Sequence, residues 1–186
     1  MKREYTITIF TENKIGLLHR ITVIFTRRHL NIDSLNTSES EVRGIYRFTI
    51  VVTTTESMVQ TLTKQIEKQI GILKAFYHTE DEIVYQEIAL YKVPTKAFAH
   101  GDDVESLIRK FNARVLTIEP EYIVVEKTGH KTETQQLFRE LESYGILQFA
   151  RSGRIAMTKQ IKEITSYLKE LEQFQKESEE EVLTYN

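Results

Sequence analysis

The residues best suited to chemistry lie where a strand pattern ends and a helix pattern begins. Ile9 closes an alternating apolar segment, Asn13 follows in a polar turn, and Gly16 precedes an apolar helical stripe. N–H groups at a helix start carry the positive end of the helix dipole, so they can bind a carboxylate. Gly16 permits close approach of a ligand, and the Asn13 amide can donate and accept hydrogen bonds. The segment therefore predicts a site for a small zwitterion.

The same residues also have a purely structural interpretation. Asn13 is a common turn residue, and glycine at position 16 suits an unusual φ. Asn31, at the start of the next strand pattern, suits a cap or a left-handed residue. Because turns select the same residue types as ligands do, the local sequence leaves both interpretations open.

The segments that must position this junction follow a βαββαβ order. Period-two patterns predict strands at residues 5–10, 31–37, 45–53 and 72–77. A helical stripe contains Leu17, Leu18, Ile21, Ile24 and Phe25, and a second contains Met58, Leu62 and Ile66 after a Ser57 cap. This order is typical of the ferredoxin-like fold.

A similar order follows in the second half of the chain. Strands are predicted at residues 87–93, 113–118, 122–126 and 146–150, with a helix capped by Asp102 or Asp103 and another beginning at Thr132 or Thr134. The predicted fold class is therefore α+β, with two ferredoxin-like βαββαβ domains. The acidic segment at residues 80–82 marks the seam, so we expect domains at 1–79 and 80–158.

The last residues, 159–186, have a different composition. Apolar side chains recur at helical spacing among Lys and Glu, namely Ile161, Ile164, Leu168 and Leu171. This pattern predicts an amphipathic helical, charged extension. Packing against its own domain and docking on a partner are both compatible with it.

The composition excludes several classes of partner. The 186 residues include 25 Lys and Arg against 27 Asp and Glu, so the net charge of -2 disfavours binding to nucleic acid or an anionic membrane. The absence of cysteine rules out disulfides and thiolate sites. With no apolar run near the ~18 residues of a spanning helix, we expect a cytoplasmic chain.

Catalytic and metal-binding patterns are missing. The histidines show no HExxH spacing, and the glycines stand singly, without the GxSxG, Walker or GxGxxG patterns. We therefore expect no catalytic residue and no metal site on this chain.

Several sequence blocks resemble the small, regulatory subunit of acetohydroxyacid synthase, also called acetolactate synthase. That family reads ENxxGxLxR and FxxRGxNIxSL, which matches ENKIGLLHR at residues 12–20 and FTRRHLNIDSL at residues 25–35. Further matches, in the same order, are RFTIVV at 47–52, TKQIEK at 63–68, EIALYKV at 87–93 and ARSGRI at 150–155. The resemblance covers about residues 4–158.

The resemblance implies a regulatory protein without its own active site. The N-terminal domain would be an ACT domain that forms a homodimer and binds amino acids at the shared interface. The chain would activate a catalytic large subunit and confer feedback inhibition by a branched-chain amino acid, usually valine. Thiamine diphosphate, Mg²⁺ and FAD would belong to the large subunit, which makes 2-acetolactate.

The resemblance also assigns an effector site. Asn13 and Gly16 fall in the family's effector loop, and Asn31 takes its second asparagine. We expect the effector carboxylate to accept N–H bonds from Gly16, Leu17 or Leu18, and the two asparagine side chains to bind its polar groups. Ile15 would contact the apolar side chain and the partner protomer.

Two departures from the family pattern affect this site. Ile15 replaces a common proline, so the loop is less fixed in φ. His29 replaces a common glycine, and if φ is positive there it must either be strained or adopt the left-handed conformation, which His tolerates better than a β-branched residue. Two other functions fit the sequence: a free-standing ACT-domain sensor that regulates another protein or a transcript, and a stand-alone enzyme with pyruvate chemistry.

Overall fold

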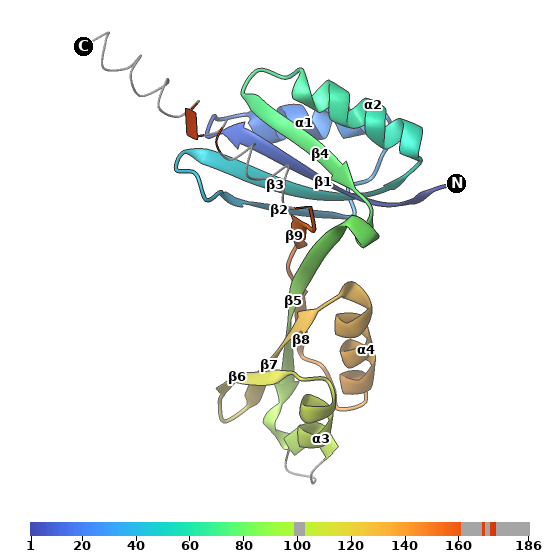
Figure 1. The fold of residues 1–186 in the computed structure, drawn as a ribbon. Helices are drawn as coiled ribbons and strands as arrows, with labels where there is room; N and C mark the ends of the chain where they lie inside the picture. The colour runs from blue at the N-terminus through green and yellow to red at the C-terminus, as the bar shows by residue number, and fades with distance from the viewer. Residues whose placement is uncertain (99–102, 161–168, 170–171, 174–186) are drawn as a thin grey trace, which may run out of the picture. The chain divides into compact units, whose positions relative to one another are not determined.

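The computed structural model describes residues 1–98 and 103–160, together with Lys169, Glu172 and Gln173. The chain divides into two compact units (Figure 1). The first comprises Met1–Val84 and the described residues from Ala156 onward, and the second comprises Tyr85–Ile155. Among the described residues, no helix is both long and apolar enough to cross a membrane.

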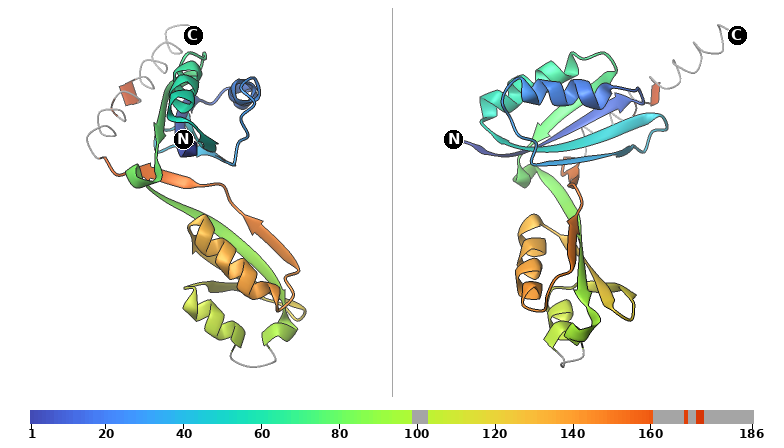
Figure 2. Two further views of the ribbon diagram at one scale, coloured as in Figure 1. Left: turned by 90° about the vertical axis from the view of Figure 1, so that its right-hand side faces the viewer. Right: turned by 180° about the vertical axis from the view of Figure 1, so that it is seen from behind.

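The first unit is a four-stranded antiparallel sheet with both helices on one face (Figure 2). Its elements are β1 (Arg3–Glu12), α1 (Leu17–Thr26), β2 (Ser34–Glu39), β3 (Ile45–Thr54), α2 (Glu56–Glu67) and β4 (Ile72–His78). The strand order is β2-β3-β1-β4, so β1 is central and β4 is an edge. Ile7 and Ile9 of β1 pack with Ile21 of α1 and Leu62 of α2, and all four side chains are buried.

The second unit repeats this arrangement. After the 3-10 turn η1 (Glu80–Glu82), which belongs to the first unit, come β5 (Ile83–Pro94), η2 (Thr95–Phe98), α3 (Asp103–Lys110), β6 (Arg114–Ile118), β7 (Tyr122–Gly129), α4 (Lys131–Glu142) and β8 (Gln148–Arg151). The last strand, β9 (Ile155–Thr158), belongs to the first unit from Ala156 onward. The order β6-β7-β5-β8 is that of the first sheet, with β9 added on β5. Tyr91 of β5 packs with Val104 of α3 and Leu137 of α4. The predicted α+β class with two ferredoxin-like domains is confirmed.

The two units also end their first helices in the same way. His29 has φ 53° and Asn112 has φ 49°, so both are left-handed residues. The N–H of Leu30 then donates to the carbonyl of Phe25 at 3.1 Å, and the residue after Asn112 bonds the carbonyl of Ile108 at 2.9 Å. This is the C-terminal motif that usually contains glycine. His29 therefore adopts the left-handed conformation expected if glycine is the family residue.

Several predicted details in the first unit are wrong. The second strand begins at Ser34 rather than at Asn31, because residues 31–33 form the connection to β2. Helix α2 begins after Thr55, not after Ser57, and its buried stripe uses Val59 in place of Met58. Val59 precedes Leu62 by three residues and Ile66 by seven, so it shares their face of the helix.

Other differences concern exposure and helix starts. Leu18 was predicted in the buried stripe of α1 but is 38% exposed. Helix α4 has His130 as its N-cap rather than Thr132 or Thr134. The strand β9 was not predicted. The predicted cap Asp102 and the predicted helix over residues 161–171 lie outside the described residues, apart from Lys169.

The left-handed residue His29 gives a test of helix-end strain. An L-residue in this conformation costs about 1–2 kcal/mol, whereas glycine does not. We expect His29→Gly to raise the free energy of unfolding by about 0.5–1 kcal/mol, after the entropy cost of glycine is subtracted. Urea denaturation measures the change. Asn112→Gly should give a smaller gain, because asparagine tolerates this conformation better. A loss of stability in His29→Gly would contradict this interpretation.

Candidate functional site

The loop between β1 and α1 is shaped by one left-handed residue. Gly16 has φ 85° and ψ -3° and stands at the N-cap position of α1. Before it, the N–H of Lys14 donates to the carbonyl of Glu12 at 3.0 Å, and the Lys14 ammonium lies 2.6 Å from the Glu12 carboxylate. The loop is therefore a tight turn whose own charges are paired.

The N-terminus of α1 has no capping side chain. Gly16 provides none, and the first turn contains no acidic residue. Within the described chain, the N–H groups of Leu18 and His19 have no hydrogen-bond acceptor, while the N–H of Leu17 makes one long bond of 3.4 Å to Lys14. These N–H groups, with the helix dipole, form a place where an anion is stabilised.

Helix α4 shows the contrasting case. There the Glu133 carboxylate accepts the N–H of His130 at 2.7 Å, as in a capping box. The side chains of His130 and Glu133 thus cap the start of α4 reciprocally, whereas no side chain caps that of α1.

The predicted site residues differ in exposure: one is buried in the core and the others are exposed. Leu17 is 2% exposed and fixes the helix start in the core. Asn13 and Gly16 are exposed, and Ile15 is fully exposed at 100%. An isoleucine without any cover is unfavourable in water, so this side chain is available to a ligand or a second protomer.

Asn31 occupies a different loop. It is exposed and lies in the α1–β2 connection rather than in a strand. No hydrogen bond within the described residues joins it to Asn13 or Gly16. The structure therefore groups Asn13, Ile15, Gly16, Leu17 and Leu18 in one loop and helix start, with Asn31 outside that group.

One supporting residue was missed by the sequence interpretation. The carbonyl of Gly71 accepts the N–H of Glu12 at 3.0 Å. A Cβ at Gly71 would lie 3.2 Å from Cδ1 of Leu17 and 3.3 Å from Oε2 of Glu12. Gly71 therefore supports the loop by close contact, although in sequence it is recognisable only as a helix-ending glycine.

We also searched the described residues for side chains that could together hold a metal ion. They contain no group of three or more His, Asp or Glu side chains arranged to hold a metal ion.

Family models match both halves of the chain. An "AHAS small subunit-like ACT domain" matches residues 7–74, and "Small subunit of acetolactate synthase" matches residues 86–160. The acetolactate synthase small subunit of Bacillus subtilis is 39% identical over 160 residues, covering 86% of this chain and 91% of its own length. That of Mycolicibacterium smegmatis is 35% identical over 155 residues, covering 83% and 91%.

A solved structure agrees with these sequence matches. The crystal structure of the acetolactate synthase small subunit from Thermotoga maritima has a TM-score of 0.77 with 25% sequence identity. It covers 86% of this chain and 99% of its own.

Gly71 allows a test of loop support. Gly71→Ala imposes the strain of φ 89° and also pushes Cβ against Leu17, whereas Gly44→Ala, at φ 78°, meets nothing within 4 Å. We expect Gly44→Ala to lower the free energy of unfolding by about 1–2 kcal/mol through strain alone. Gly71→Ala should cost about 1 kcal/mol more through overpacking. Urea denaturation of both variants compares them, and equal losses would show that the contact with Leu17 is unimportant.

Proposed function

This chain belongs to the family of acetolactate synthase small subunits, and from that premise we propose a regulatory role for it. It binds the thiamine-diphosphate-dependent large subunit, raises its activity and confers feedback inhibition by a branched-chain amino acid, with valine as the first candidate. It makes no 2-acetolactate itself, and thiamine diphosphate, Mg²⁺ and FAD are held by the large subunit. A cytoplasmic location is part of this proposal.

The open start of α1 is the observation that supports an effector site best. Its Leu18 and His19 N–H groups have no acceptor in the described chain, and Gly16 leaves the approach free of side-chain atoms. An amino-acid carboxylate would satisfy these donors and gain from the helix dipole. The Leu17 N–H already bonds Lys14, so Leu18 is the better donor.

The remaining site residues surround this carboxylate position. In the proposed complex, the Asn13 and Asn31 side chains bind the polar groups of the effector. Ile15 contacts the effector's apolar side chain and the partner protomer. Since Ile15 is fully exposed in the single chain, both contacts would remove apolar surface from water.

We assign effector binding to the first of the two proposed domains. Residues 1–79 form the ACT domain that binds the effector and pairs with its copy. Residues 80–158 form the second ferredoxin-like domain. Most of residues 159–186, the predicted helical extension, lie outside the described residues.

An acetolactate assay tests this function directly. The large subunit is measured with and without this chain, in the presence of valine, leucine or isoleucine. We expect the chain to raise the rate, and one of the three amino acids to reduce it again only when the chain is present. If a cognate large subunit is neither bound nor activated, a free-standing amino-acid sensor becomes the better proposal. Acetolactate formation by the chain alone would instead indicate an enzyme.

Gly16→Asp tests the carboxylate position. An aspartate beside the open N–H groups repels the effector carboxylate, and we expect valine affinity to fall about tenfold or more. Crowding is not the cause, because a Cβ at Gly16 meets nothing within 4 Å. Gly16→Asn is the matched control, since it has the same size and a similar tolerance for the left-handed conformation but no charge.

Titration calorimetry with valine measures both Gly16 variants. We expect Gly16→Asn to stay within about threefold of the parent. Activation of the large subunit should persist in both variants. Equal valine affinity in Gly16→Asp and the parent would place the effector elsewhere.

Asn13→Ala tests the side-chain contacts of the effector. Loss of hydrogen bonds to a charged group should weaken valine binding by about tenfold. Lys14→Ala is the control, because this neighbouring side chain is paired with Glu12 and has no proposed contact to the effector. Inhibition curves in the acetolactate assay give the apparent affinity, and equal shifts in the two variants would argue against a direct role of Asn13.

A further inference from the structure

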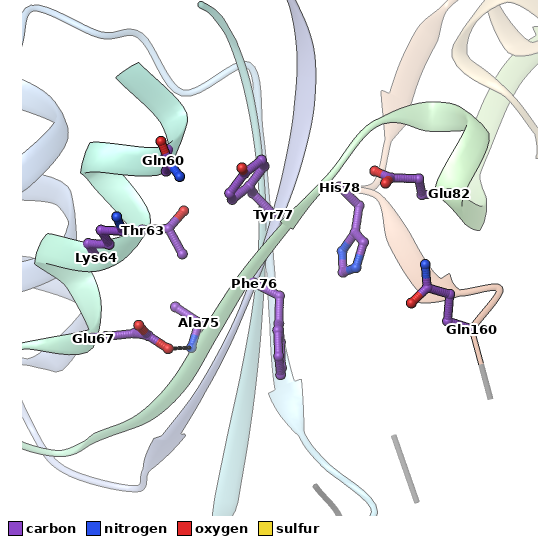
Figure 3. Close-up of a pocket in the computed structure, with 10 residues that line it drawn as sticks. All are labelled: Gln60, Thr63, Lys64, Glu67, Ala75, Phe76, Tyr77, His78, Glu82 and Gln160. Carbon is purple, nitrogen blue, oxygen red and sulfur yellow. Dashed lines mark hydrogen bonds between the residues drawn. The ribbon is translucent and has the colours of Figure 1, made fainter. Parts of the chain in front are cut away.

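The first unit contains a second concave site, between α2 and the edge strand β4 (Figure 3). Its volume is about 370 Å³, within the range of small-molecule pockets. None of the residues that line it belongs to the loop between β1 and α1. The close-up shows lining side chains from α2 on one side of β4, and Glu82 and Gln160 on the other.

The backbone of β4 explains why this pocket does not suit an added strand. The N–H of Ala75 donates to the Glu67 carboxylate at 3.4 Å, and the N–H of Thr79 donates to the Glu82 carboxylate at 2.8 Å. Since outward N–H groups alternate along a strand, that of Tyr77 points the same way, and it has no acceptor in the described chain. A pairing strand would have to displace both carboxylates, whereas a small acceptor can reach Tyr77 alone.

Charges of both signs line the pocket. The Lys64 ammonium on α2 makes no ion pair within the described chain, so it can bind an anionic group. Glu67 and Glu82 supply negative charge at opposite ends of the exposed β4 backbone, and the Glu67 carboxylate also lies 3.5 Å from the Lys74 ammonium. The hydrogen bond from the Thr79 backbone holds the pKa of Glu82 below its usual value. A ligand with one carboxylate and one ammonium group would match this arrangement.

The remaining polar groups indicate the ligand's side chain. Gln60 and Gln160 contribute amides, which both donate and accept hydrogen bonds. The Thr63 hydroxyl already donates to the carbonyl of Val59 at 2.9 Å, so its proton is not available to a ligand. The Gln60 amide lies on the same helix as Lys64 and Glu67 and favours a polar, uncharged group over a branched aliphatic one.

We propose that this pocket binds a small α-amino acid with a polar, uncharged side chain. Its carboxylate accepts the Tyr77 N–H and lies near Lys64, its ammonium group lies beside Glu67, and its side chain contacts the Gln60 amide. This site goes beyond the proposed effector function and is separate from the β1–α1 loop.

Amide NMR spectra of the ¹⁵N-labelled full chain test the proposal. Serine, threonine, asparagine and glutamine are titrated singly into the millimolar range. We expect at least one of them to shift the Tyr77 and Lys64 resonances while those of Gly16 and Leu18 stay unchanged. The analogues of that amino acid lacking the carboxylate or the amino group should not do so. If none of the four moves the Tyr77 resonance, or if the shifts lie at Gly16 and Leu18, the proposal is overturned.

A pair of lysine variants tests the charge. Lys64→Gln should weaken binding of the amino acid found above by about two- to fivefold, the range of an exposed ion pair. Lys68→Gln is the matched control, because Lys68 is exposed at the end of the same helix and does not line the pocket. Equal affinities in Lys64→Gln and Lys68→Gln would refute the carboxylate contact. Gly16→Asp should bind as the parent does, so failure of the valine site leaves this result intact.

Discussion

The first unit depends on the pairing of β1 with two neighbours at once. Ile7 lies opposite Ile50 of β3 and Tyr77 of β4, so this strand cannot move without breaking two ladders. Its last residue, Glu12, is held in turn by the carbonyl of Gly71. The loop and the start of α1 therefore stand at the end of the most constrained strand, which is where a binding site keeps its geometry best.

The first turns of α1 and α4 differ in how their backbone N–H groups are hydrogen-bonded. At the start of α4, the Glu133 carboxylate accepts the His130 N–H and the His130 side chain accepts the Glu133 N–H, whereas the N–H groups of Leu18 and His19 remain without an acceptor in the described chain. Open donors at a helix start cost little in water, because water can bond them. Once a ligand or a second protomer excludes that water, the donors need another acceptor. A carboxylate ligand would meet this need.

The sequence predicted the order of elements well, because each one has a clear period and is bounded by glycine or polar residues. It also identified the junction at Gly16, and it predicted the left-handed conformation of His29 only for the case that φ is positive there. It failed where the outcome depends on contacts far along the chain. Gly71 lies close to Leu17 although more than half of the first unit's sequence separates them. Nothing in the local sequence pattern reveals that contact. Similarly, the start of α2 at Thr55 was hidden by the equally good cap residue Ser57.

The two proposed sites in the first unit differ in their chemistry. Around the start of α1, the exposed side chains include two aliphatic ones, Ile15 and Leu18, so an apolar ligand gains by covering them. Beside β4, the available groups are the Tyr77 N–H, the Lys64 ammonium and amides, so an apolar ligand would leave polar groups unsatisfied. Both can bind the carboxylate and ammonium groups that all amino acids share. The residues around one site favour an apolar ligand side chain, whereas those around the other favour a polar one. One ferredoxin-like unit would thus distinguish two classes of amino acid, because one site follows the end of the central strand β1 and the other lies beside the edge strand β4.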